Sequence, residues 1–313
     1  MRFGAQLWSQ HTTWPEFRDS ALAADRTGWD SVWTWDHLLA IFGPWEQPIL
    51  EGWTTLAALG PITKTVRLGL MVGANTFRNP GLTAKLATTL DHVSGGRAVL
   101  GIGGAWFERE HDAFGFDATW GSSVGERLDR LDESVLLMRR LLDGERFSHD
   151  GRYYTMRDAL CAPGPVQAHL PILIGGSGPK KTLRTVAERA DAWNTSGTIE
   201  EVTAKLAILD DHCAGVGRDP KSITRSVNMA LLITDKKDEV DQLAKTIETR
   251  MGRHAADARD TCLAGTPDQI REQLHQLKAA GCGVLFIPSM FRPLPELRRD
   301  LDRFIKEIAP AFR

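Results

Sequence analysis

The stretch GGRAVLGIGGAWFEREHDAFG, residues 95–115, places an apolar run directly before glycines and a cluster of acids. The run RAVLGIG at 97–103 is apolar on both faces, as a parallel strand covered by helices requires, whereas a half-exposed antiparallel strand would alternate. Trp106 follows, and then Glu108 and Glu110 in a polar segment. The stretch therefore predicts a buried strand whose C-terminal end opens onto a polar site.

Seven further apolar runs recur along the chain, separated by stretches with helical periodicity. They cover residues 2–7, 29–35, 66–73, 171–176, 190–195, 224–233 and 283–289. Between them, apolar residues stand three or four apart, as from Leu128 to Leu142 and from Leu294 to Ile308, which is the pattern of an amphipathic helix. Eight alternating strands and helices favour an α/β fold of the closed (β/α)8 TIM-barrel type over a doubly wound sheet, which would carry a glycine fingerprint after its first strand.

Two connections are long, so we expect insertions after strands 4 and 7, at residues 104–170 and 234–281. The first contains ERFSHDGRYYTM, which predicts a hairpin with Asp150-Gly151 at its turn. Thr266 before Pro267 predicts the start of a helix. No segment rich in Pro, Gly or Ser divides the chain, and we expect residues 1–313 to form a single domain.

Composition and charge exclude several classes of function. Apolar residues make up 42% and charged residues 25% of the chain, as in an ordinary globular protein. A net charge of −2 with mixed signs gives no positive field for nucleic acid. Without a signal peptide pattern or an apolar run of about 18 residues, we expect a cytoplasmic protein that does not bind membranes. The four cysteines and the histidines lack metal-site spacing, so we expect neither a metal nor disulfides.

Polar residues at the C-terminal ends of barrel strands are the candidate site, because active sites of such barrels lie there. Asp36 and His37 follow the second strand, where a histidine can exchange protons near neutral pH or merely cap a loop. The segment GGSG at 175–178 joins a strand to a helix. Its backbone N–H groups can bind an anion such as a phosphate, although a plain strand-to-helix turn uses the same residues.

Glycines and tryptophans at the strand ends have two interpretations each. Gly101, Gly103 and Gly104 leave the end of the fourth strand without side chains, either so that a flat ring can lie against the backbone or because structural packing requires it. Aromatic side chains near strand ends can line a pocket for a flat ligand or simply pack. The tryptophans considered for substrate contact are Trp8, Trp45 and Trp106.

Taken together, these segments resemble the luciferase-like monooxygenase superfamily, and most closely its branch of oxidoreductases that use the deazaflavin coenzyme F420. The matching segments are WDH at 35–37, TFRNPGLTAKLATTLDHVSGGRAVLGIGGAWFEREHDAFGF at 76–116, ERLDRLDE at 126–133, GRYYTMRDALCAPGPVQ at 151–167 and PILIGGSGPKKTLRTVAERADAWN at 171–194. The resemblance implies a (β/α)8 barrel, often a homodimer, that holds F420, or alternatively FMN, at the strand C-termini.

The resemblance also implies a role for individual residues. It puts the coenzyme phosphate on Gly175, Gly176 and Ser177, and a cis peptide bond behind the ring at Met71-Val72. The other implied coenzyme contacts are Asp36, Gly73, Asn75, Gly103 and Trp193. Proton transfer falls to His37 and to Glu108, with Glu110 as the second choice because the register is ambiguous by two residues.

Three functions are compatible with this resemblance. The first is an F420-dependent oxidoreductase that transfers a hydride between the deazaflavin and a small organic substrate. The second is an FMN-dependent monooxygenase that uses O2 and a reduced flavin, with a flavin or F420 reductase as partner. The third is a barrel that binds a flavin or metabolite without catalysis.

Overall fold

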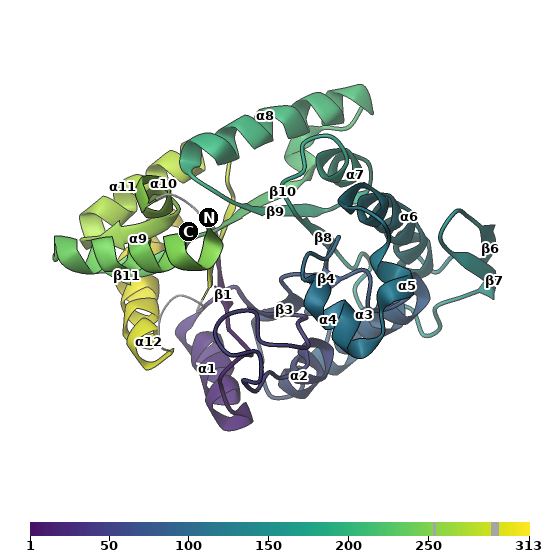
Figure 1. Cartoon of the computed structure of the whole chain (residues 1–313), viewed down its shortest axis with the longest axis horizontal. Helices are drawn as coiled ribbons and strands as arrows, with labels where there is room; N and C mark the ends of the chain where they lie inside the picture. The colour runs from purple at the N-terminus through teal and green to yellow at the C-terminus, as the bar shows by residue number, and fades with distance from the viewer. Residues whose placement is uncertain (253–254, 289–293) are drawn as a thin grey trace.

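A computed structural model describes residues 1–252, 255–288 and 294–313. Its central feature is a closed parallel sheet with helices around it, seen from one end in Figure 1. The strand order is β3-β2-β1-β13-β10-β9-β8-β5-β4, and pairing of β3 with β5 closes the ring. Because β3 and the short β4 occupy one position in the ring, the fold is the predicted eight-stranded (β/α)8 barrel.

The barrel elements agree with the predicted runs to within a few residues. The strands are β1 (Arg2–Gln6), β2 (Ser31–Thr34), β3 (Arg67–Leu70), β4 (Gly73–Ala74), β5 (Ala98–Gly103), β8 (Ile172–Gly175), β9 (Ala192–Ser196), β10 (Thr224–Asn228) and β13 (Val284–Pro288). The main helices are α1 (Trp14–Thr27), α2 (Gly52–Leu59), α3 (Pro80–Ser94), α6 (Val124–Leu142), α7 (Thr182–Arg189), α8 (Ile199–Gly215), α11 (Pro267–Ala279) and α12 (Leu294–Arg303). Residue 289 of the last predicted strand lies outside the described residues.

The first insertion contains two short helices and the predicted hairpin. Helices α4 (Glu108–Phe114) and α5 (Asp117–Trp120) follow β5, and strands β6 (Phe147–Asp150) and β7 (Thr155–Ala159) pair antiparallel after α6. The hairpin projects from the edge of the barrel in Figure 1. Its turn is closed by a hydrogen bond from the Gly151 N–H to the Tyr154 carbonyl, so the predicted turn position is confirmed.

The second insertion corrects one predicted strand. The run 224–233 is not one strand, because β10 ends at Asn228 and β11 (Ala230–Ile233) leaves the barrel to pair with β12 (Cys262–Gly265). Side chains of β11 pack instead into a separate small core with α9 (Lys237–Met251) and α10 (Ala255–Asp260). The sequence did not predict this break, because both halves of the run are apolar. Both are buried, but in different cores.

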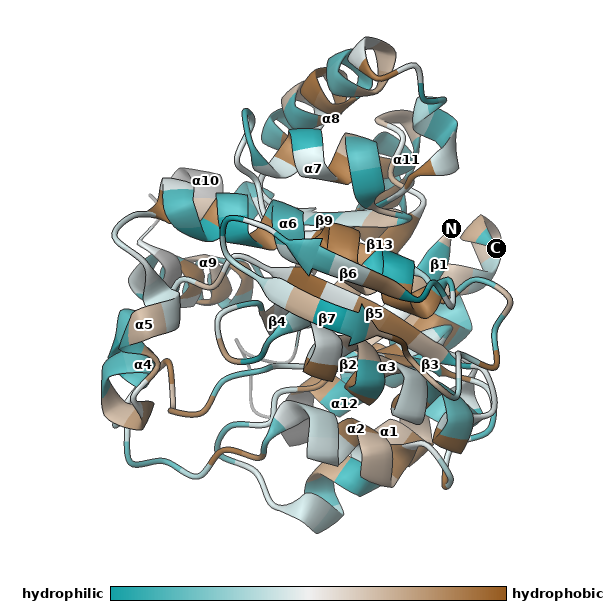
Figure 2. Ribbon diagram, turned by 90° about the vertical axis from the view of Figure 1, so that its right-hand side faces the viewer, coloured by the Kyte–Doolittle hydropathy of each residue, from teal (hydrophilic) through white to brown (hydrophobic). Residues whose placement is uncertain are grey.

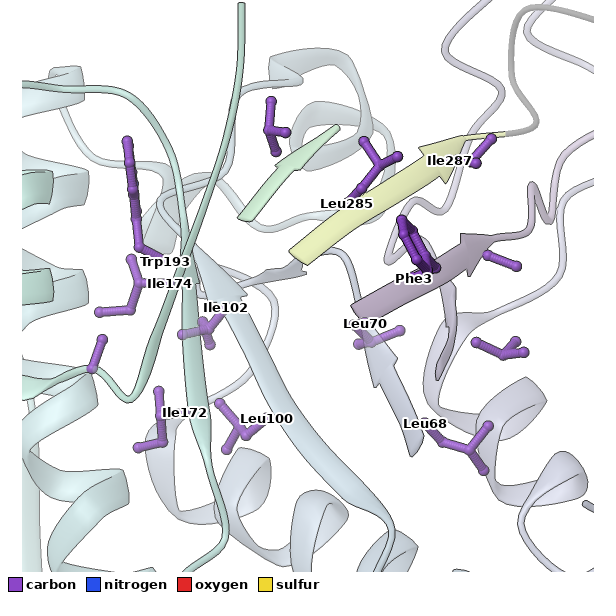
Figure 3. Close-up of a cluster of buried hydrophobic side chains, with 14 of the residues drawn as sticks. Phe3, Leu68, Leu70, Leu100, Ile102, Ile172, Ile174, Trp193, Leu285 and Ile287 are labelled. Atoms are coloured by element: carbon purple, nitrogen blue, oxygen red, sulfur yellow. The ribbon is translucent and has the colours of Figure 1, made fainter. Parts of the chain in front are cut away.

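Two apolar layers hold the barrel. Outward-facing strand residues such as Phe3, Leu100 and Ile174 pack against the helices in the main core, shown in Figure 3. Inward-facing residues, among them Trp33 and Phe286, fill the barrel interior. Figure 2 shows apolar colours concentrated on the central strands, whereas the surrounding helices carry both apolar and polar colours. None of the described helices is long and apolar enough to span a membrane.

Glycines facing the interior make room for these side chains. A Cβ at Gly101 would lie 1.9 Å from the Leu70 carbonyl oxygen and 3.4 Å from the Trp33 ring. At Gly104 it would lie 3.0 Å from Leu128, and at Gly103 it would lie 2.8 Å from Val72. Packing therefore requires glycine at 101, where a Cβ would overlap a backbone carbonyl, so the interpretation that this residue clears space for a flat ligand is wrong; the neighbours of Gly103 and Gly104 are side-chain atoms.

We predict that Gly101→Ala destabilises the protein by about 1–3 kcal/mol or more, because its methyl group overlaps a backbone carbonyl that cannot rotate away. Urea unfolding followed by circular dichroism measures the effect. Gly215→Ala is the control, since no atom lies within 4 Å of a Cβ there. In this helical position alanine should be neutral or stabilising by up to about 1 kcal/mol. A wild-type midpoint for Gly101→Ala would contradict the packing argument.

Candidate active site

His37 and Glu110 meet at the C-terminal end of the barrel. His37 follows β2, and its Nδ1 lies 2.9 Å from Oε1 of Glu110, which α4 carries after β5. The other oxygen, Oε2, accepts the Leu38 N–H at 2.9 Å. The Glu110 side chain is 2% exposed and that of His37 is 15% exposed. The contact therefore engages Nδ1 and leaves Nε2 as the ring nitrogen available to a ligand.

Glu108 lies apart from this pair. It stands in the first turn of α4 and is exposed, and its Oε1 accepts the indole N–H of Trp120 at 3.0 Å. The register left open by the sequence is therefore resolved in space, since Glu110, and not the first choice Glu108, contacts His37. Two residues along a helix correspond to a rotation of about 200°, so the two carboxylates point in different directions.

Aromatic rings surround His37. The rings of Trp35 and Trp106 each stand edge to face with it, at centroid distances of 5.6 Å. Trp8 packs against Trp35 at 5.4 Å. Of the three tryptophans predicted to contact substrate, Trp8 and Trp106 thus belong to this cluster. Trp45 lies in an exposed loop, where Arg109 covers its ring at 4.8 Å, and no contact joins it to His37.

Asp36 is buried and fully engaged within the protein. Arg78 donates to both of its oxygens at 2.7 and 3.0 Å, and the Ala74 N–H donates to Oδ2 at 2.8 Å. Arg78 also bonds Glu51, the N-cap residue of α2. Burial raises the pKa of Asp36, although Arg78 and the Ala74 N–H favour its charged form. Asp36 therefore ties the loop after β2 to β4 and to the loop that follows β4, and the sequence did not single out Arg78 as its partner.

Val72 forms the apolar floor at this end of the barrel. A Cβ at Gly103 or at Gly175 would lie 2.8 Å from its methyl groups, so both strands need glycine beside it. The Met71-Val72 peptide bond is cis, as the resemblance implied. Met71 itself is buried in the interior core. Gly73 then pairs with Ile102 of β5 at the rim.

Two buried amide side chains border this floor with unused acceptors. Asn75 donates from Nδ2 to the Tyr154 hydroxyl at 3.2 Å, while its Oδ1 has no partner. Gln6 donates to the Met71 carbonyl at 3.3 Å, and its Oε1 also has no partner. Buried polar atoms are normally paired, so these oxygens point to a ligand with N–H or O–H donors. Tyr154 comes from the hairpin region and was not anticipated as a neighbour of Asn75.

The segment after β8 offers free amides, but not all those predicted. The Gly176 N–H is already used by the Asn194 carbonyl at 3.0 Å, and the Gly176 carbonyl accepts the Trp193 indole N–H at 2.8 Å. Trp193 is fully buried in the main core, and its indole holds this loop. Within the described residues, the amides of Ser177 and Gly178 have no hydrogen-bond partner and lead into α7. Of the predicted cradle of Gly175, Gly176 and Ser177, Ser177 thus offers a free amide and Gly176 does not, and Gly178 adds a second free amide.

His111 is a buried residue that the sequence analysis did not assign to the site. Its Nδ1 lies 2.9 Å from the Phe107 carbonyl, and its Nε2 lies 2.6 Å from the Thr76 hydroxyl. Burial lowers its pKa, which favours the neutral ring. His111 therefore fastens α4 to the loop after β4. In the described part of the chain, no three His, Cys, Asp or Glu side chains are grouped to hold a metal ion.

Comparison with known proteins agrees with this architecture. An uncharacterised protein of Mycobacterium tuberculosis is 32% identical over 170 residues, which are 54% of this chain and 58% of that relative's length. An F420-dependent glucose-6-phosphate dehydrogenase of Nocardia farcinica is 31% identical and covers 95% of this chain and 94% of its own. An F420-dependent secondary alcohol dehydrogenase in complex with an F420-acetone adduct superimposes with a TM-score of 0.87 at 20% identity, over 100% of this chain and 99% of that one.

The family assignment follows from the sequence match along most of the chain. The sequence model described as luciferase-like monooxygenase matches residues 1–283, from the first barrel strand to the start of the last. The barrel, the cis peptide bond after β3 and the polar cluster at the strand C-termini lie within that range. The chain belongs to the luciferase-like monooxygenase family.

Proposed function

We propose that this protein is an F420-dependent oxidoreductase that transfers a hydride between the deazaflavin and a small organic substrate. The observation that carries the proposal is the His37–Glu110 pair at the C-terminal end of the barrel, which engages Nδ1 and leaves the other imidazole nitrogen available to a ligand. The relative of Nocardia farcinica is an F420-dependent dehydrogenase that matches nearly the whole chain. Its name and that of the secondary alcohol dehydrogenase favour substrates with an alcohol or carbonyl group.

The described residues fit a deazaflavin on chemical grounds. The unpaired oxygens of Gln6 and Asn75 can accept N–H or O–H groups of a polar ring edge. The free amides of Ser177 and Gly178 can bind a phosphate. Val72 offers a flat, apolar contact between two glycines. When bound, the coenzyme supplies the hydride acceptor or donor.

The protein's own contribution is proton transfer and orientation. Glu110 accepts from Nδ1 of His37, which selects the tautomer with an unprotonated Nε2. In alcohol oxidation, Nε2 accepts the hydroxyl proton as the hydride leaves the carbon. In carbonyl reduction, the imidazolium returns that proton to the oxygen. The rings of Trp35 and Trp106 hold the imidazole and exclude water from one side.

Two other functions would use the same residues and can be told apart by experiment. An FMN-dependent monooxygenase would use the same floor and cradle, because FMN has a similar tricycle and a phosphate, and it would need a reductase partner. A non-catalytic binder would hold a flavin or metabolite without turnover. The Nδ1-protonated tautomer of His37 favours the oxidoreductase, because a protein that only binds a ligand has no use for an unprotonated imidazole nitrogen at the site.

We further propose a cytoplasmic homodimer. Leu82 and Val93 are exposed and lie eleven residues apart on α3, hence on one face of that helix. Val166, also exposed, is tied to α3 because its N–H donates to Asp91 at 2.8 Å. An apolar face of this kind suits a second copy of the chain. The four cysteines are unpaired, as in a reducing compartment.

Titration of the purified protein with each coenzyme tests the proposal directly. We expect F420 to bind with a dissociation constant in or below the range of about 1 μM to 1 mM that is usual for enzyme ligands, and FMN to bind more weakly. Quenching of coenzyme fluorescence provides the measurement. Tighter binding of FMN would favour the monooxygenase. If neither coenzyme bound, both redox functions would be excluded.

We predict that His37→Ala lowers turnover by about 100-fold or more, because general acid-base catalysis is lost. Coenzyme affinity should change little. The assay is F420 reduction by a panel of alcohols and sugar phosphates, followed by absorbance. His92→Ala is the matched control, since His92 is exposed on α3 and bonds only the Gly164 carbonyl. Wild-type turnover in His37→Ala would remove His37 from the mechanism.

Glu110→Gln should reduce alcohol oxidation by about tenfold or more. A glutamine can still accept the Leu38 N–H, but its amide group then donates to Nδ1 of His37, which leaves the proton on Nε2 and blocks proton uptake. The unfolding midpoint and the coenzyme affinity should stay close to wild type. Glu108→Gln, assayed in parallel, should have a smaller effect. The reverse order would assign the proton role to Glu108.

A further inference from the structure

Helix α4 carries Glu110 to the site but is too short to hold its own orientation. It has 7 residues, and its N-cap residue, Phe107, makes no side-chain cap. Helices of this length are unstable in isolation, so the orientation of α4 depends on contacts with other elements. Glu110 makes one such contact, with His37 and Leu38 in the loop after β2. One contact alone would leave the helix free to pivot about it.

The next residue of the helix, His111, ties α4 to a second loop of the barrel. Its Nε2 lies 2.6 Å from the hydroxyl of Thr76, in the loop between β4 and α3. His111 is 0% exposed and Thr76 is 3% exposed, so water does not compete for this contact. The His111 ring also packs against Phe77, at a centroid distance of 5.0 Å. Adjacent residues of α4 therefore contact two different loops, which fixes both the position and the rotation of the helix.

The hydrogen bond between Thr76 and His111 has a defined direction. The Phe107 carbonyl lies 2.9 Å from Nδ1 of His111 and can only accept, so Nδ1 carries the ring hydrogen. Nε2 of the neutral ring is then an acceptor, and the Thr76 hydroxyl donates to it. Replacing Thr76 by valine, which has the same shape, removes the donor and leaves a buried ring nitrogen unpaired. The contact therefore depends on one hydroxyl group.

The surroundings of His111 favour the neutral ring that this bond requires. Burial is the largest influence and lowers the pKa of His111, and the positive charge of Arg127 acts in the same direction. Trp120 contacts both groups, at 4.3 Å from the His111 ring centroid and 3.7 Å from Cζ of Arg127. The carboxylates of Glu110 and Asp112 oppose the shift without cancelling it. Near neutral pH the ring can therefore accept the hydroxyl hydrogen.

We propose that Thr76 and His111 are positioning residues for proton transfer, because they hold α4 at the rotation at which Glu110 reaches Nδ1 of His37. The inference rests on the proposed function, in which Glu110 keeps the ring hydrogen of His37 on Nδ1. When the Thr76 bond is lost, α4 can rotate and Glu110 withdraws. The imidazole of His37 is then free to carry its hydrogen on Nε2, where it blocks uptake of an alcohol proton. The alternative is a purely structural role, in which the bond only stabilises the fold.

The first measurement needs no coenzyme. NMR of the ring nitrogens distinguishes the two tautomers of His37, and the spectrum of His37→Ala assigns its signals. We expect the hydrogen on Nδ1 in wild type and in Thr76→Ser, which keeps the hydroxyl, and a shift toward Nε2 in Thr76→Val and Thr76→Ala. Thr88→Val is the matched control, since Thr88 is 2% exposed on α3 and its hydroxyl lies 3.5 Å from Sγ of Cys161. An unchanged tautomer in the folded Thr76→Val or Thr76→Ala protein would overturn the inference.

The second measurement is F420-dependent alcohol oxidation. Thr76→Val should lower kcat about 3- to 10-fold and change KM and the F420 dissociation constant by less than about twofold. In a Glu110→Gln background the same substitution should cause little further loss, because the carboxylate through which Thr76 acts is gone. An additive loss in the double variant would assign Thr76 a structural role and overturn the inference, with the proposed function intact. If wild type showed no F420-dependent turnover, the proposed function would fall, and the tautomer of His37 would still decide whether Thr76 positions Glu110.

Discussion

The shape of the site depends on the absence of side chains at four interior positions. Trp33 can occupy the lower barrel only because Gly69 carries no Cβ, which would lie 2.5 Å from its ring, and Gly101 lets the Leu70 carbonyl approach its strand. Val72 can reach the axis only because Gly103 and Gly175 flank it. These contacts fill the barrel to a fixed depth. The height at which a planar ligand can rest is thus set by packing between strands, before any polar contact is made.

Above that floor, buried charges determine which groups remain available. Asp36 and Glu110 are both buried carboxylates next to His37 in space or sequence, and each has its oxygens occupied by donors from a neighbouring loop. Such pairing keeps the carboxylates from binding a ligand directly and makes them positioning groups. Of Asp36, Glu110 and His37, the imidazole of His37 is thus the group that keeps an atom available to a ligand.

Much of the fold was readable from periodicity, because a parallel barrel strand is apolar on both faces and a surface helix is amphipathic. The break between β10 and β11 at Met229 could not be predicted, because β11 enters a second core and is as apolar as β10. At the site, residues next to strand ends were predictable in kind: His37 and one of two glutamates. Which glutamate, and that Arg78 would saturate Asp36, depended on helix register and on contacts between segments about 40 to 70 residues apart. Trp193, predicted as a coenzyme contact, packs in the main core, because strand alternation, and not proximity to the strand end, decides which side chains face inward.

The angular positions of side chains on α4 determine two contacts of the site at once. Glu108 and Glu110 share that single short helix, and one secures Trp120 while the other secures His37. Adding or removing one residue inside α4, between Glu108 and Glu110, would turn one carboxylate by about 100° relative to the other, so that Trp120 and His37 could no longer both be held. The first turn of α4 is therefore a poor place to vary when substrate range is to be altered, whereas residues 38–50 do not position two site contacts in this way. Drift among relatives should accumulate there first.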